Sequence, residues 1–210
     1  MENLLDLYEQ PYNPAFPVIC FDERPCQLIG DVLTPLPMRP GSPRKEDYQY
    51  QRNGTCCILC AVEPLRGRRK VRVFRRRTKK EYSLFIKELI TQWYPSATCI
   101  RLVQDNLNTH SAGSFYEVFS PQEAHCLMEK IEFHYTPKKA SWLNMAEIEL
   151  AALSKQCLDR RIADQTTLTR EVRSCERERN RRNIKISWRF TTNDARTKLS
   201  RHYLNVTQSS

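Results

Sequence analysis

The sequence predicts an α/β fold in which a mixed sheet, made of an antiparallel hairpin plus parallel strands, is flanked by helices and followed by a basic helical segment. Short β-rich runs alternate with segments whose apolar residues recur every three or four positions, as expected for strands joined by crossover helices. In addition, 40% of the 210 residues are hydrophobic. This content is enough for one full core and excludes a chain that is disordered throughout.

The first elements are expected to be one short strand and a long surface loop. Residues 17–21 form a continuous apolar run that stops at Asp22-Glu23-Arg24-Pro25, a pattern typical of a buried strand followed by a turn. Eight of the twelve prolines fall at or before position 43. Because proline disrupts helices and central strands, the stretch 35–43 is predicted to be a loop.

A hairpin, a helix and a second strand are expected next. The β-rich runs 55–62 and 70–74 are separated by Glu63-Pro-Leu-Arg-Gly67, which predicts a hairpin. A helix should begin at Thr78, carry one apolar stripe and end before Pro95. Residues 98–103 then read as a strand that again ends close to an acid.

The remaining sequence continues the alternation. We expect a helical pair within 111–130, a strand at 131–135, a helix from about Asn144, and basic helical segments at 166–182 and 193–203. These elements divide the chain into an N-terminal tail at 1–16, a core at 17–158, and a basic helical C-terminal extension of the same domain at 159–210.

Cysteine usage and hydropathy exclude several classes of protein. The nine cysteines are scattered and mostly lie in apolar runs, unlike those of a secreted disulfide scaffold. Cys57 and Cys60 form a CxxC, but strand geometry would point them to opposite faces, so we interpret them as small buried hydrophobic residues. No apolar run is long enough for a membrane span, and the acidic N-terminus does not resemble a signal peptide.

Positive charge is concentrated in one block. Ten Lys or Arg and no acid lie between Arg66 and Lys80, which equals the formal net charge of +10 of the whole chain. Such a block creates a local field suited to a polyanion such as nucleic acid. The alternative is a hairpin edge that its charges protect against aggregation.

Two acids follow predicted strands that we expect to be neighbours. Asp22 ends the first apolar run, and Asp105 ends the run Leu102-Val-Gln-Asp. If these strands are parallel, the two carboxylates come together at the edge of the sheet where α/β folds build their sites. Two adjacent carboxylates repel each other, so they favour a shared proton or a divalent cation, and oxygen ligands suit Mg²⁺.

The third acid is less certain from spacing alone. With Asn144 as helix N-cap, Glu147 falls in the first turn, where the helix dipole favours a carboxylate. Glu149 lies on nearly the opposite side of that helix, so only one of the two can readily join Asp22 and Asp105. The spacing of Asn144 and Glu147 also fits a capping box, which would need no catalytic role.

Three segments together carry a resemblance to a known family. They are Val18-Ile-Cys-Phe-Asp-Glu23, Leu102-Val-Gln-Asp-Asn-Leu-Asn-Thr-His110 and Tyr135-Thr-Pro-Lys-Lys-Ala-Ser-Trp-Leu-Asn-Met-Ala-Glu147. They resemble the three acidic motifs of bacterial insertion-sequence transposases of the mariner-like DDE superfamily, over residues 17–203. The separation of 42 positions between Asp105 and Glu147 is longer than in the best-known mariner relatives. Only about sixteen residues precede the first strand, so the chain resembles the catalytic half alone.

The resemblance implies a ribonuclease-H-like fold and a DDE transposase or endonuclease that cleaves DNA and transfers strands at transposon ends. Asp22, Asp105 and Glu147 would be the catalytic, metal-binding triad for two Mg²⁺ ions, which Mn²⁺ can replace. Supporting roles would fall to Asn106, His110 and Asn144, although His110 and Asn144 also fit a loop hydrogen bond and a helix cap. DNA contacts are expected from Arg68, Arg69, Lys70, Arg75, Arg76, Arg77, Lys138, Lys139 and Trp142, the last of which also fits a core aromatic.

The implied partners are double-stranded DNA at the transposon ends and target, a homodimer on DNA, and a separate N-terminal helix-turn-helix chain. No membrane partner is expected, and the location would be the bacterial cytoplasm, at the nucleoid. Two other functions fit the same residues. One is a ribonuclease-H-like structure-specific nuclease, and the other is a truncated, non-catalytic DNA-binding remnant.

Overall fold

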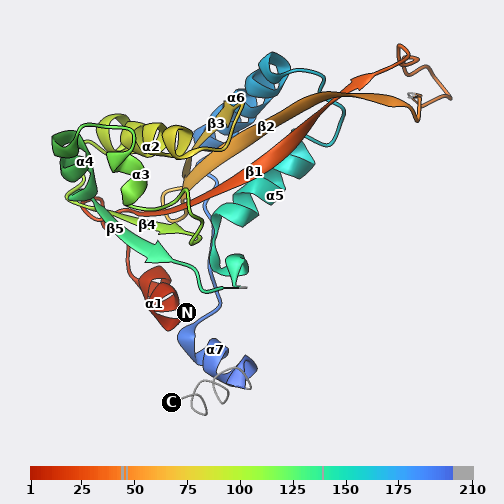
Figure 1. The fold of residues 1–210 in the computed structure, drawn as a ribbon. Helices are drawn as coiled ribbons and strands as arrows, with labels where there is room; N and C mark the ends of the chain where they lie inside the picture. The colour runs from red at the N-terminus through yellow and green to blue at the C-terminus, as the bar shows by residue number, and fades with distance from the viewer. Residues whose placement is uncertain (44, 46, 139, 201–210) are drawn as a thin grey trace.

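The computed structural model describes residues 1–200 except 44, 46 and 139. One five-stranded sheet forms its centre, in the order β3-β2-β1-β4-β5 (Figure 1). The strands are β1 (Val18–Asp31), β2 (Tyr50–Glu63), β3 (Arg68–Phe74), β4 (Ile100–Gln104) and β5 (Ile131–Tyr135). The helices are α1 (Glu2–Glu9), α2 (Lys79–Glu88), α3 (Gly113–Tyr116), α4 (Pro121–Met128), α5 (Ala146–Gln156), α6 (Gln165–Arg181) and α7 (Thr192–Lys198), with a π-helical turn η1 (Leu89–Trp93) and a 3₁₀ turn η2 (Ser141–Leu143).

The sheet confirms the predicted mixture of strand directions. β2 pairs antiparallel with β1 and with β3, which is the expected hairpin plus its neighbour. β1 and β4 are parallel, as are β4 and β5. The parallel strands are connected by helical crossovers, α2 between β3 and β4 and the pair α3 and α4 between β4 and β5.

The first strand is much longer than predicted, and the turn expected at Asp22-Glu23-Arg24-Pro25 is absent. β1 continues to Asp31 and pairs with β2 along this length, with a register shift between Gln27 and Ile29. β4 accompanies β1 only as far as Cys20, so beyond this point β1 is an edge strand and Pro25 is tolerated there. Together β1 and β2 form a ribbon that projects from the body of the molecule (Figure 1).

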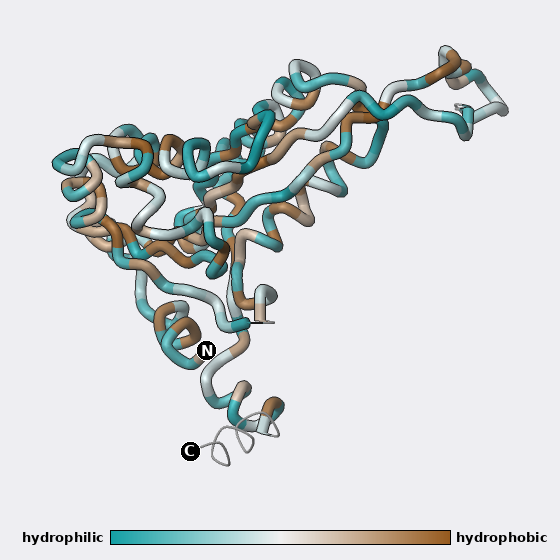
Figure 2. Tube along the Cα trace, in the orientation of Figure 1, coloured by the Kyte–Doolittle hydropathy of each residue, from teal (hydrophilic) through white to brown (hydrophobic). Residues whose placement is uncertain are grey.

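Side chains alternate between two buried faces of the sheet. Ile19 and Phe21 pack with residues of α2, η1, α3 and α4 in one cluster. On the other face, Ile58 and Cys60 pack against the apolar sides of α5 and α6. The buried part of the sheet therefore lies between two layers of helices, in which hydrophilic and hydrophobic residues alternate along the chain (Figure 2). Cys57 and Cys60 lie in different clusters, as the CxxC spacing on a strand predicted.

The segment 1–16, expected as a tail, contains the helix α1. Its Leu4, Leu5 and Leu7 are buried and join a third cluster with Cys20 and residues near α5 and α7. α1 and α7 lie next to each other below the sheet, near both ends of the chain (Figure 1). No helix in the described ranges has the length and apolar character needed to cross a bilayer.

Candidate active site

Asp22 and Asp105 lie at the same level of two neighbouring parallel strands. The parallel pairing of β1 and β4 ends with Cys20 opposite Val103, and each acid is two residues further along its own chain. The expectation that these strands are parallel neighbours is therefore confirmed. The two carboxylates sit at the carboxyl edge of the parallel part of the sheet, where α/β folds place their sites.

Asp22 experiences an environment that disfavours its charge. Burial, together with the smaller effect of the negative charges of Glu23, Asp105 and Glu147, raises the pKa of Asp22 to about 7. One opposing contact favours the ionised form, because the backbone N–H of Glu23 donates to Asp22 Oδ1 at 2.8 Å. The repulsion means that acids from β1, from the end of β4 and from α5 act on one another at this edge.

Asn144 connects the start of α5 to the strand that carries Asp22. Its Nδ2 donates to the carbonyl oxygen of Phe21 at 2.7 Å, and its Oδ1 accepts from the backbone N–H of Ala146 at 3.1 Å. The predicted N-cap position is wrong by one residue, since Met145 is the N-cap and makes no side-chain cap bond. The capping box is absent, and Glu147 remains in the first turn of α5.

Glu149 points to a different part of the structure. Its two carboxylate oxygens accept from Arg179 of α6 at 2.7 and 2.9 Å, and Arg69 of β3 lies 3.0 Å from Oε1. The side chain is buried. Glu149 thus holds α5, α6 and β3 together, which leaves Glu147 as the acid of this helix that faces Asp22.

His110 joins the second acid to Glu23, a residue that the sequence analysis did not select. Its Nδ1 lies 2.5 Å from Asp105 Oδ1, and its Nε2 lies 2.6 Å from Glu23 Oε2. Arg77 contacts the other oxygen of Glu23 at 3.1 Å. The residues form a charged chain from Asp105 through His110 and Glu23 to Arg77. Glu23 directly follows Asp22 on a strand, so it faces the opposite side of the sheet.

The charged side chains of this row stabilise one another's ionised forms. Burial opposes the positive charge of His110, but Asp105 and Glu23 outweigh it and raise the pKa of the imidazole to about 9. In return, the hydrogen bond from His110 lowers the pKa of Asp105. His110 is therefore an imidazolium at neutral pH and holds Asp105 ionised, which goes beyond a simple loop hydrogen bond. Gln104 supports the loop by donating to the His110 carbonyl at 2.8 Å.

Two of the cations expected to contact DNA are buried instead. Arg69 and Lys70 both have side chains that are 0% exposed. Arg69 binds Glu149 and the carbonyl of Ile184, and Lys70 binds Glu88. Their placement in a DNA-contacting surface is wrong, because these consecutive residues of β3 point to opposite faces of the sheet and both faces are covered by helices. Arg68 is partly exposed, and its guanidinium packs on Trp93 at 4.3 Å from the ring centroid.

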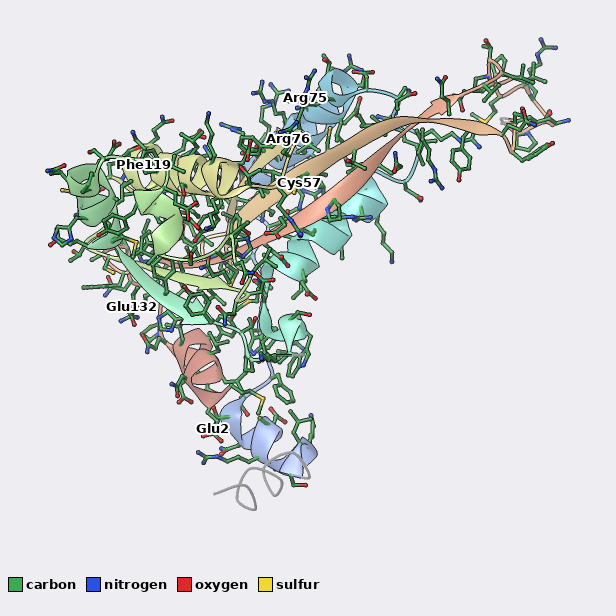
Figure 3. The ribbon with its side chains drawn as sticks, viewed as in Figure 1. Glu2, Cys57, Arg75, Arg76, Phe119 and Glu132 are labelled. Carbon is green, nitrogen blue, oxygen red and sulfur yellow. The ribbon has the colours of Figure 1, made fainter. Side chains whose placement is uncertain are left out.

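The later cations of the basic block are exposed. Arg75, Arg76 and Arg77 follow the end of β3, and Figure 3 shows Arg75 and Arg76 on the side of the molecule where α6 lies. Lys138 and Asn106 are also exposed, whereas Lys139 lies outside the described residues. Trp142 is 43% exposed and stacks on Trp188, with ring centroids 6.3 Å apart. It therefore covers an aromatic cluster on one side and faces solvent on the other.

The donor set at this edge suits a hard divalent cation. Asp22, Asp105 and Glu147 supply carboxylate oxygens, the ligands that Mg²⁺ and Mn²⁺ prefer, and the pKa of Asp22 is raised first by burial and then by the neighbouring acids. Among the residues that the structure describes, no group of three or more Asp, Glu, His or Cys side chains is in a position to hold a metal ion. The chemistry of the donors fits the expected metal ions.

Comparisons with known proteins address the family and the fold of the chain. The family model for the DDE superfamily endonuclease matches residues 17–169. No curated protein matches the chain. Among solved structures, the Mos1 mariner paired end complex with Mn aligns with a TM-score of 0.58 and 13% identity, covering 87% of this chain and 55% of that one.

A second solved structure, the Mos1 Strand Transfer Complex, aligns with a TM-score of 0.52 and 10% identity, covering 89% of this chain and 60% of that one. This chain therefore spans little more than half the length of the transposase chains that it matches. At these identities the structural likeness shows the fold, and it confirms the expected ribonuclease-H-like architecture. The family model covers more than half of the chain, and on that ground the chain belongs to the DDE superfamily endonucleases.

Proposed function

We propose that this chain is the catalytic domain of a transposase, which cleaves DNA at the ends of a mobile element and transfers the strand to a target. The observation that carries the proposal is that Asp105 and Glu147 both act on Asp22, whose pKa they raise in addition to the larger effect of burial. Membership of an endonuclease family supports it. Asp22, Asp105 and Glu147 would hold two Mg²⁺ or Mn²⁺ ions.

When bound, a pair of such ions stabilises the attacking and leaving oxygens of an in-line phosphoryl displacement. The role of the surrounding residues is to position the carboxylates that would hold these ions. The backbone N–H of Glu23 orients the Asp22 carboxylate, and His110 keeps Asp105 ionised. Asn144 fixes the start of α5, and with it Glu147, against the carbonyl before Asp22.

The partner we propose is double-stranded DNA, both at the transposon ends and at the target, and the matched structures are transposase complexes of the paired end and strand transfer type. The exposed cations Arg75, Arg76, Arg77 and Lys138 and the half-exposed Trp142 are the proposed contacts near the acids. A homodimer on DNA, a separate helix-turn-helix chain that reads the ends, and action at the nucleoid of a bacterial cell are parts of the same proposal.

Strand transfer distinguishes a transposase from a nuclease that uses the same acids. Purified protein is incubated with Mg²⁺, a precut end that carries a free 3′-OH, and a supercoiled target plasmid. We expect joined products, because the 3′-OH replaces water as the nucleophile at the acid site. Asp22→Asn is the matched control and should give none.

Two outcomes would contradict this proposal in different ways. Nicked or shortened DNA without any joined product would indicate a structure-specific nuclease. Tight DNA binding with neither cleavage nor joining, in Mg²⁺ and in Mn²⁺, would indicate a non-catalytic DNA-binding remnant.

A further inference from the structure

A broad groove runs between α6 and the outer strand β3. It has a volume of about 940 Å³, and η1 contributes one wall through Trp93. Its charged lining consists of five arginines and two acids, namely Arg72, Arg75, Arg170, Arg173, Arg177, Asp164 and Glu176. A second hollow of similar size on another side of α6 holds four cations and three acids. The first groove therefore has the stronger positive field, which favours an anionic occupant.

Three of the five arginines of α6 form one stripe along the helix. Thr166, Thr169, Arg170, Arg173 and Arg177 all line the groove, and their spacing of three or four residues places them on one face. Successive arginines are about one helical turn, or 5.4 Å, apart along the axis. The stripe thus offers a row of guanidinium and hydroxyl groups, which are the side chains that proteins use for phosphate contacts.

Most of these arginines are available for binding. Arg170, Arg173 and Arg177 are exposed, and within the described ranges Arg173 and Arg177 make no ion pair, while Arg170 has one long contact of 3.7 Å to Glu171. Arg75 reaches across the groove to Gln165 at 3.3 Å. By contrast, Arg72 is engaged by Glu88 at 2.9 Å. The free charge of the groove lies on the α6 side.

One end of the groove lies close in sequence to a cation that contacts a neighbour of the acid site. Arg75 lines the groove, and Arg77, only two residues further, contacts Glu23 beside Asp22. Two residues of extended chain span about 7 Å. The positive charge of Arg77 also helps to lower the pKa of Asp105. Positive charge therefore continues from Arg75 in the groove to Arg77, which pairs with Glu23, the partner of His110.

The lining favours recognition of a backbone over recognition of bases. Trp93 is the aromatic residue of the lining, and Arg68 and Lys70 already pack on its ring at 4.3 and 4.9 Å from the centroid. It is therefore a poor platform for a stacked base, and single-stranded binding relies on such platforms. Arginine and threonine without a free aromatic suit the phosphates of a duplex.

We infer that the groove between α6 and β3 is a second DNA-binding surface, which holds the backbone of the duplex that flanks the cleavage site. This inference rests on the proposed function for the identity of the duplex. It extends that function to residues outside the family match. The match ends at position 169, so it does not include Arg170, Arg173 and Arg177. This surface increases the affinity for DNA and fixes the position of the duplex along the protein. It contributes no group to the reaction.

The test measures binding without catalysis. Fluorescence anisotropy follows the full chain on a duplex of about 30 base pairs in EDTA, between about 50 and 200 mM salt. For the double variant Arg173→Gln/Arg177→Gln we expect the slope of log K against log salt to fall by about 2, and affinity to drop on the order of tenfold per lost contact. Asp22→Asn should bind as tightly as the wild type, so failure here is distinguishable from failure of the catalytic proposal.

Matched controls distinguish loss of the groove contacts from a change in net charge and from misfolding. Arg160→Gln/Arg182→Gln removes two exposed cations from the other side of α6 and should keep the wild-type slope. Arg173→Lys/Arg177→Lys keeps the charge and should keep most of the affinity, and thermal melting should show that all variants are folded. Equal losses in both glutamine pairs, or an unchanged slope for Arg173→Gln/Arg177→Gln, would overturn the inference.

Discussion

Glu147→Gln is expected to reduce Mg²⁺-dependent DNA cleavage by about a thousandfold or more, and Glu149→Gln to destabilise the fold by about 3–5 kcal/mol. The first value follows because the charge stabilisation supplied by a bound metal is worth several kcal/mol in a transition state. The second follows because removing one partner of a buried ion pair leaves the other charges uncompensated. Among the residues that the structure describes, Glu149 is the acid that forms an ion pair with both Arg69 and Arg179.

The two variants form a matched pair, since each replaces one glutamate of the same helix by its neutral isostere. Urea unfolding followed by circular dichroism gives the stability, and cleavage of a labelled DNA end gives the activity. Glu147→Gln should unfold within about 0.5 kcal/mol of the wild type, as is usual for residues outside the buried network. Retained cleavage by Glu147→Gln, or wild-type stability of Glu149→Gln, would show that the two roles are assigned wrongly.

Asp22→Asn is expected to stabilise the metal-free protein by about 2–4 kcal/mol at pH 8 and to change its stability little at pH 4. In the folded protein, burial and neighbouring acids raise the pKa of Asp22 from 3.8 to about 7. Ionised Asp22 therefore weakens the fold. This loss of stability is absent below the pKa of Asp22 in the unfolded chain. It grows as the pH rises toward the folded pKa, and the Asp22→Asn substitution removes it.

Asp105→Asn is the control with the opposite sign. The hydrogen bond from His110 lowers the pKa of Asp105 in the folded protein, so its ionised form stabilises the fold above the unfolded pKa and this contribution is lost as pH falls. Asp105→Asn should therefore destabilise the protein at pH 8. Urea unfolding in EDTA across pH 4–8 measures both effects. A destabilised Asp22→Asn protein at pH 8 would contradict the account of this site.

Local sequence patterns predicted most of the elements of the fold. They failed where contacts with distant parts of the chain determine the structure. The apolar stripe that begins at Thr78 predicted α2, and the run 131–135 predicted β5 with the bounds that the structure shows. The run from Asp22 to Pro25 read as a turn, because nothing local reveals that β2 pairs along it while β4 has already ended. The helix α1 was missed because its short apolar stripe becomes informative only when it is packed against the sheet.

The sequence suggested the acids of the candidate site but not the residues that support them. Strand ends pointed to Asp22 and Asp105, whereas helix phase left Glu147 and Glu149 as alternatives; the motif resemblance favoured Glu147, and the contact of Glu149 with Arg179 assigns Glu149 to the buried network. Glu23 carries no signal of its own, since an acid beside Asp22 is equally consistent with a solvated position. The burial of Arg69 follows from its partner Glu149, which lies 80 positions away in sequence, so composition alone overstated the exposed cations.

Binding of Mn²⁺ tests most directly whether Asp22, Asp105 and Glu147 form one metal site. Electron paramagnetic resonance of free Mn²⁺, titrated with the full chain at pH 8, gives the affinity and the number of ions without reference to activity. The account predicts that Asp22→Asn, Asp105→Asn and Glu147→Gln each weaken binding by about tenfold or more, and that Glu132→Gln, an exposed acid on β5, leaves it unchanged. Wild-type affinity in all three triad variants would contradict it.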